Sequence, residues 1–199
     1  MKKIGLIFSL GALLLFAGCK DEKIDQNTFS TQSNISKEEL NKAQNLDEAS
    51  YAGLEHIFSN TSEISSDGKY PILIFGKNNC QWCDRLKDDI KEDKSTQEIL
   101  KKDFKSYYVN LSYNKIHRID FATQKGDIDS MALATQYSIR PTPTIVFLDK
   151  EGKPIVIYPG YLPQVQFRKI LDLISSGEYL KAKNPQELHQ MIQAKLQGE

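Results

Sequence analysis

Apolar residues along the chain fall into short runs whose spacing predicts alternating strands and helices. Residues 70–75 form a run rich in isoleucine, with glycine close by on either side, and predict a buried strand. From 83 to 99 apolar residues recur among many charged ones, which is typical of a helix that covers one face of a sheet. Residues 104–111 predict a second strand. Strand, helix and strand therefore form a crossover unit of an α/β protein.

The second half of the chain predicts another helix, a hairpin and a last helix. Residues 127–137 have a helical pattern. Residues 144–158 predict a β-hairpin with its turn at 149–153. Pro163 opens an amphipathic helix that Gly177 ends, and its expected inward residues are Val165, Phe167, Ile170, Leu171 and Ile174.

A polar segment, 113–126, separates the second strand from the helix that follows. It holds His117 and Arg118 and is longer than a simple connection requires, so we interpret it as an insertion that shapes substrate contacts. The acidic residues Asp127 and Asp129 are expected to cap the next helix.

The first eighteen residues have the pattern of an export signal. Met1 is followed by two lysines and by an apolar run to Phe16 that only small residues interrupt. This run is short for a transmembrane helix, which needs about 20 residues, and a polar segment begins at Lys20. A spanning anchor is therefore the weaker interpretation.

Residues 15–19, Leu-Phe-Ala-Gly-Cys, resemble the bacterial lipoprotein box, in which the cysteine thiol carries diacylglycerol. Phe16 stands where the box usually has leucine. The resemblance implies that 1–18 are a lipoprotein signal peptide and that Cys19 is lipidated. Several acyl chains would hold the protein firmly, because each buried methylene contributes about 0.8 kcal/mol. The alternative is that Cys19 only lies near an ordinary cleavage site.

The chain after the signal divides into a tether, a folded domain and a tail. Residues 19–45 are polar with few large apolar side chains, so a flexible tether is expected. Within it, 36–39 have the capping-box spacing of a helix start, and apolar residues between 46 and 58 suggest helical segments leading into the fold. Residues 46–180 are expected to form the domain and 181–199 a C-terminal helical tail.

Composition and charge suit one globular domain and give no reason to expect nucleic acid as a partner. The 199 residues are 40% hydrophobic, and 26 Lys and Arg balance 26 Asp and Glu.

The cysteines are better explained by chemistry than by stabilisation. With Cys19 assigned to lipid, Cys80 and Cys83 have only each other to pair with. A structural disulfide in an exported protein normally closes a longer loop, because the stabilisation grows with loop length. We therefore interpret Cys80 and Cys83 as a redox pair.

Their position relative to the predicted helix assigns a role to each. Cys80 stands at the start of a helix, where the helix dipole and free N–H groups lower a thiol pKa from about 8.5 toward 7 or below. It is therefore the expected nucleophile. Cys83 lies within disulfide reach, deeper in the helix, and is the expected resolving cysteine.

Other uses of two close cysteines can be weighed from the sequence. Haem attachment needs a histidine after the second cysteine, where Asp84 stands. Zinc needs four ligands, and His56, His117 and His189 are scattered without a second close pair. These histidines receive no role and no cofactor is expected. A two-coordinate copper(I) site stays open as the runner-up, since two thiolates suffice.

Four motifs resemble the thioredoxin superfamily: Ile-Leu-Ile-Phe-Gly at 72–76, Cys-Gln-Trp-Cys at 80–83, Arg-Pro-Thr-Pro-Thr at 140–144 and Pro-Gly-Tyr at 159–161. The chain looks most similar to SoxW-like periplasmic thioredoxins and to the catalytic domain of bacterial disulfide isomerases. The resemblance covers about 69–175. It implies a thioredoxin-like fold, with a central mixed β-sheet flanked by helices and a polar insertion before a cis-proline segment.

The resemblance also implies roles for residues around the pair. Pro143 would be the cis-proline, with Thr142 offering backbone groups to an extended substrate and Trp82 contacting it. Because Pro141 is also present, the sequence alone does not decide which proline is cis, and the family pattern favours Pro143.

Two departures from the family leave the direction of electron flow open. Ile74 stands where many thioredoxins carry a buried acid, so proton relay to Cys83 must differ. Gln81 and Trp82 match neither reducing thioredoxins nor strong oxidants, whose potentials span about −270 to −120 mV.

We therefore expect a monomeric protein-disulfide reductase, lipid-anchored on the periplasmic side of a bacterial cell envelope. Exported disulfide-containing proteins would be its clients, and a membrane electron donor would re-reduce it. Disulfide isomerase or oxidase activity is the alternative within this class. A copper(I)- or apoprotein-binding thiol chaperone is the alternative outside it.

Overall fold

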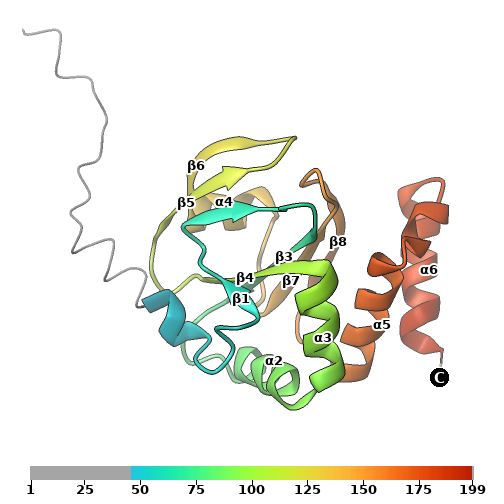
Figure 1. Ribbon diagram of the computed structural model, residues 1–199, viewed down its shortest axis with the longest axis horizontal. Helices are drawn as coiled ribbons and strands as arrows, with labels where there is room; N and C mark the ends of the chain where they lie inside the picture. The colour runs from blue at the N-terminus through green and yellow to red at the C-terminus, as the bar shows by residue number, and fades with distance from the viewer. Residues whose placement is uncertain (1–45, 199) are drawn as a thin grey trace, which may run out of the picture. The chain divides into compact units, whose positions relative to one another are not determined.

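A mixed sheet of five strands forms the centre of the computed structural model, which describes residues 46–198. The strands lie in the order β1 (Phe58–Ser59), β4 (Phe104–Asn110), β3 (Tyr70–Gly76), β7 (Thr144–Leu148) and β8 (Pro154–Pro159). Strands β1, β4 and β3 are parallel, whereas β7 and β8 each run antiparallel to the strand before them in this order (Figure 1). The central mixed sheet expected from the sequence is present.

Strand β3 is buried on both faces of this sheet, which explains its continuous apolar sequence. Ile72 and Ile74 belong to one hydrophobic cluster, and Leu73 and Phe75 belong to the other. This division follows the two-residue period of a strand. The sheet therefore needs cover on each side.

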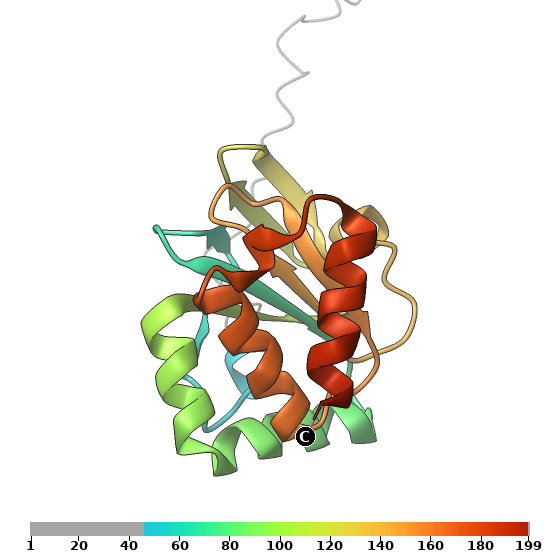
Figure 2. The same cartoon turned by 90° about the vertical axis from the view of Figure 1, so that its right-hand side faces the viewer.

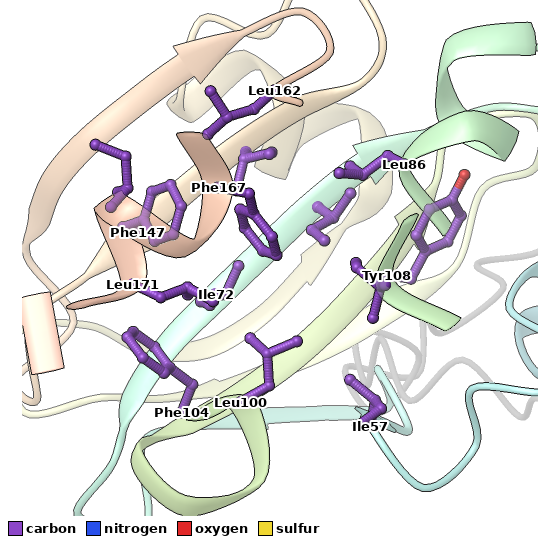
Figure 3. Packing of buried hydrophobic residues seen from close by; sticks show 14 of the residues in the cluster. Ile57, Ile72, Leu86, Leu100, Phe104, Tyr108, Phe147, Leu162, Phe167 and Leu171 are labelled. Carbon is purple, nitrogen blue, oxygen red and sulfur yellow. The ribbon is translucent and has the colours of Figure 1, made fainter. Parts of the chain in front are cut away.

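Three helices cover the face that carries Ile72: α2 (Gln81–Glu92), α3 (Lys94–Asp103) and α5 (Gln164–Ser175). Figure 3 shows Leu86, Leu100 and Phe167 from these helices gathered around the strands. The final helix, α6 (Pro185–Gln197), lies beside α5 (Figure 2), after a short 3₁₀ turn, η1 (Glu178–Lys181). Its Ile192 joins the same cluster, so part of the segment 181–199 packs onto the domain.

The other face is covered by α4 (Ser130–Gln136) and by a small second sheet (Figure 1). This sheet has the order β2 (Glu63–Ser65), β5 (Ile116–Asp120) and β6 (Lys125–Asp129). Strands β2 and β5 are parallel, and β5 and β6 are antiparallel.

The polar segment 113–126 thus contains β-structure that its sequence did not predict. In β5, His117 occupies a buried position between exposed neighbours, so the alternation of the strand is not visible as a hydrophobic pattern. Asp127, expected at a helix start, lies in β6. Asp129 does cap α4, because its carboxylate accepts a hydrogen bond from the Ala132 N–H (2.8 Å).

Three other expectations need correction. The single helix expected over 83–99 is two helices, because Asp93 ends α2 and its carboxylate caps α3 through Ser95 N–H (3.0 Å). Val165, expected to face inward, is 51% exposed on α5. Phe58, expected in a helical segment, lies in β1.

The signal peptide 1–18, the tether 19–45 with its capping box 36–39, and the lipidation site Cys19 lie outside the described residues. Between residues 46 and 198, the structure contains no helix that is both long enough and apolar enough to cross a membrane.

Gly76, the last residue of β3, has room for no side chain. A methyl group there would overlap the hydroxyl of Tyr108, a buried residue of the neighbouring strand β4. We expect Gly76→Ala to lower the free energy of unfolding by about 1–3 kcal/mol, as overpacking does, measured by urea denaturation. Combining it with Tyr108→Phe should restore part of the loss, and a double variant no more stable than Gly76→Ala would contradict this explanation.

Candidate redox site

Cys80 lies between β3 and α2, after the short loop 77–79. It is the N-cap residue of α2, and the Cys83 N–H donates a hydrogen bond to its Sγ (3.3 Å). The two cysteines form a disulfide with an S–S distance of 2.09 Å. Cys83 is fully buried and Cys80 is 7% exposed. The sulfur of Cys80 therefore meets the positive end of the helix at the edge that solvent reaches.

A cis peptide bond between Thr142 and Pro143 lies against the disulfide. The Cys80 Sγ is 3.5 Å from the Thr142 carbonyl oxygen and 3.6 Å from its hydroxyl. The Pro143 carbonyl accepts a hydrogen bond from the Gly160 N–H (2.8 Å). The proline that the family pattern favours is thus the cis one, and the segment after β8 holds it.

Trp82, between the cysteines, is 54% exposed and stacks on Tyr161, with ring centroids 5.2 Å apart. The Tyr161 hydroxyl donates to the carboxylate of Asp89, which also pairs with Arg85 (3.0 Å). Burial, followed by the Asp89 carboxylate, raises the pKa of Tyr161. Sequence reasoning assigned Tyr161 no role beyond its motif, and its place beside Trp82 follows only from the fold.

The interior beneath the pair carries no acid on β3. Ile74 is buried, and it lies opposite Tyr108 in the register of β3 and β4. Burial, followed by the negative charge of Asp84, raises the pKa of Tyr108, so this phenol stays neutral. The Lys87 ammonium lies 5.3 Å from the centre of the Tyr108 ring and 3.0 Å from Asp84. Protons must therefore reach Cys83 without a carboxylate on this strand.

The three histidines do not gather at the pair. His56 bonds to Gln97 (3.0 Å), and His189 lies exposed on α6. His117 is buried between the Thr61 carbonyl (2.7 Å) and the Ser130 hydroxyl (2.8 Å), and burial lowers its pKa. Within the part of the chain that the structure describes, His, Cys, Asp and Glu form no group of three or more that could hold a metal ion.

A disulfide-forming Cys-x-x-Cys at the head of a helix, packed against a cis-proline on a mixed sheet, defines a thioredoxin-type redox site. The chain belongs to the thioredoxin-like domain family, whose model matches residues 57–175. This fold and its paired cysteines support a function of the thiol-disulfide oxidoreductase type.

Several solved structures are similar to this chain. A thioredoxin-fold protein from Helicobacter pylori is 39% identical, with a TM-score of 0.73, and the match covers 75% of this chain and 96% of that one. A thioredoxin from Thermus thermophilus is 20% identical (TM-score 0.40; 54% and 74% covered). The exposed lipoprotein thioredoxin of Streptococcus pneumoniae is 22% identical (TM-score 0.39; 53% and 84% covered). None of the curated proteins compared with this chain matches it significantly.

Proposed function

We propose that this protein reduces disulfides of exported client proteins, with Cys80 as nucleophile and Cys83 as resolving cysteine. The proposal rests on the surroundings of the Cys80 sulfur. This sulfur accepts a hydrogen bond from the Cys83 N–H at the start of α2 and lies beside the cis peptide bond between Thr142 and Pro143. In the reduced protein that N–H and the helix dipole favour the thiolate, which is the attacking form.

The exchange takes place in two displacements. The Cys80 thiolate attacks one sulfur of the client disulfide, so that a mixed disulfide forms and the other client sulfur leaves as a thiolate and takes up a proton. Cys83 then loses its proton and attacks the Cys80 Sγ, which closes the Cys80–Cys83 bond and releases the second client sulfur. The client gains two electrons, and a membrane-bound thiol reductant must return two electrons to the pair.

The proposal also covers where the protein acts, its oligomeric state and how it contacts its clients. Lipid on Cys19, joined to the domain through the tether 19–45, would hold the protein on the periplasmic side of a bacterial membrane, within reach of that reductant and of exported clients. We propose that the protein acts as a monomer. Thr142 would present backbone groups to an extended client, as Trp82 would present its ring.

The test is a redox potential measured together with insulin reduction. The pair is equilibrated in glutathione or dithiothreitol buffers and the oxidised fraction is followed by mass spectrometry. A potential near about −270 mV with rapid insulin reduction is expected, because reducing thioredoxins lie there. A potential near about −120 mV without insulin reduction would instead indicate an oxidase and contradict the proposal.

Two further measurements separate the alternatives. A stable dimer in sedimentation, together with reactivation of scrambled ribonuclease, would favour an isomerase. Tight copper(I) binding with a potential far below the surrounding poise would favour a chaperone in which the thiols bind rather than turn over.

A further inference from the structure

A groove runs along α2 directly beyond Cys80. It has a volume of about 550 Å³ and is lined by Asn79, Gln81, Trp82, Asp84, Arg85 and Asp88. Asn79 directly precedes Cys80, and the other five residues lie on the first two turns of α2, so a polypeptide whose disulfide reaches the Cys80 sulfur passes over or beside them.

One wall of this groove is fixed in place. The Trp82 ring stacks on Tyr161, and the Tyr161 hydroxyl is bound to Asp89, a buried residue of the same helix. Tyr161 also follows Gly160, whose N–H is bonded to the carbonyl of Pro143. Trp82 and the cis-proline are thus held by one short segment, so the groove is formed before a client arrives. Preformed surfaces bind with less loss of conformational freedom.

The charges along the groove do not cancel. Asp84 pairs with Lys87 (3.0 Å), and Arg85 pairs with Asp89 (3.0 Å). Asp88 is exposed and has no ion-pair partner within residues 46–198. Each of the two cations is therefore already matched, and the groove keeps one uncompensated negative charge beside an exposed indole.

We propose that this groove selects client segments that carry a lysine or arginine near the reacting cysteine, an inference that rests on the proposed function. A basic group in the groove would gain from the unpaired carboxylate of Asp88 and from the exposed indole of Trp82. Asp88 lies about 12 Å along the helix from Cys80 at 1.5 Å per residue. An extended client advances about 3.3 Å per residue, so its basic residue stands about three to four positions from its cysteine.

The charge of the groove can be measured without turnover, because Trp82 is the one tryptophan of the chain. Its fluorescence is quenched with caesium, iodide and neutral acrylamide at equal low ionic strength, with N-acetyltryptophanamide as the reference. Relative to acrylamide, caesium should quench about twofold better than iodide, since exposed carboxylates concentrate cations around them. Asp88→Asn should narrow this difference. The matched control Asp172→Asn, which removes an exposed carboxylate of α5 outside the groove, should leave it unchanged.

Client selection is measured with two disulfide peptides that differ at one position. Three residues from the reacting cysteine, one peptide has lysine and the other has glutamate. The kcat/KM ratio of the lysine to the glutamate peptide should be about fivefold at low salt and fall at high salt, in keeping with exposed ion pairs. Asp88→Asn should lower this ratio, and Asp172→Asn should leave it as it is.

Two results would overturn the proposal. One is a kcat/KM ratio of one between the lysine and glutamate peptides in the natural protein. The other is quenching by iodide as strong as quenching by caesium, once each is compared with acrylamide and with N-acetyltryptophanamide. Neutral hydroxyethyl disulfide separates this failure from that of the proposed function. If the protein reduces hydroxyethyl disulfide but does not distinguish the peptides, only the selecting groove is wrong. If it reduces neither, the reductase proposal fails as well.

Discussion

A chain in which serine replaces Cys83 is expected to halt after one chemical step and to remain covalently attached to its client. Serine at 83 leaves Cys80 at the head of α2, so the first displacement proceeds. The second displacement lacks its attacking sulfur, and turnover stops. Cys80→Ser removes the first displacement instead and should abolish insulin reduction without trapping anything. Mixed disulfides are counted on non-reducing gels and by mass spectrometry, and turnover by the insulin assay.

Comparing these two variants tests which cysteine is the nucleophile and which is the resolving cysteine. Cys80 touches the cis-proline segment and keeps some exposure, whereas Cys83 has none, so a client can reach only the former. The double variant Cys80→Ser with Cys83→Ser is the matched control and should trap nothing. Retained insulin reduction in Cys80→Ser, or trapping by Cys80→Ser rather than Cys83→Ser, would refute the nucleophilic role of Cys80 and the resolving role of Cys83.

The cysteine pair and the strand before it could be predicted because their signals are local. An isoleucine-rich run followed by Cys-x-x-Cys predicts β3 and the start of α2 without knowledge of the rest of the fold. The hairpin of β7 and β8 is predictable for the same reason, since its turn residues and both strands are adjacent in the chain.

The remaining features depend on contacts between distant segments. Trp82 and Tyr161 meet only because β8 brings the segment after it back to α2. Asp93 looks like one more charged residue within a helix, yet its carboxylate both caps α3 and pairs with Arg168 of α5 (3.2 Å). In β5, one of the two buried side chains is His117, and its hydrogen bonds to Thr61 and Ser130 satisfy its ring nitrogens in the interior. None of these contacts can be recognised from the hydrophobic pattern of the sequence.

A buried ion pair ties the beginning of the described chain to the segment before β5. The Lys115 ammonium lies 2.5 Å from the Asp47 carboxylate, with side chains 6% and 2% exposed. The same carboxylate accepts hydrogen bonds from the hydroxyls of Thr61 and Tyr113 (3.0 Å for Tyr113). Both charges are matched, and most of the hydrogen-bonding capacity of the carboxylate is used, so losing either partner leaves the other buried alone.

We therefore expect Lys115→Met to lower the free energy of unfolding by about 3–5 kcal/mol, measured by urea denaturation. The exposed pair Lys125–Asp120, with side chains 71% and 49% exposed, is the matched control, and Lys125→Met should change stability by at most about 0.5 kcal/mol. Adding Asp47→Leu to Lys115→Met should cost less than the sum of the two single variants, because neither charge is then left unpaired. Equal losses for Lys115→Met and Lys125→Met would show that burial adds nothing to this pair.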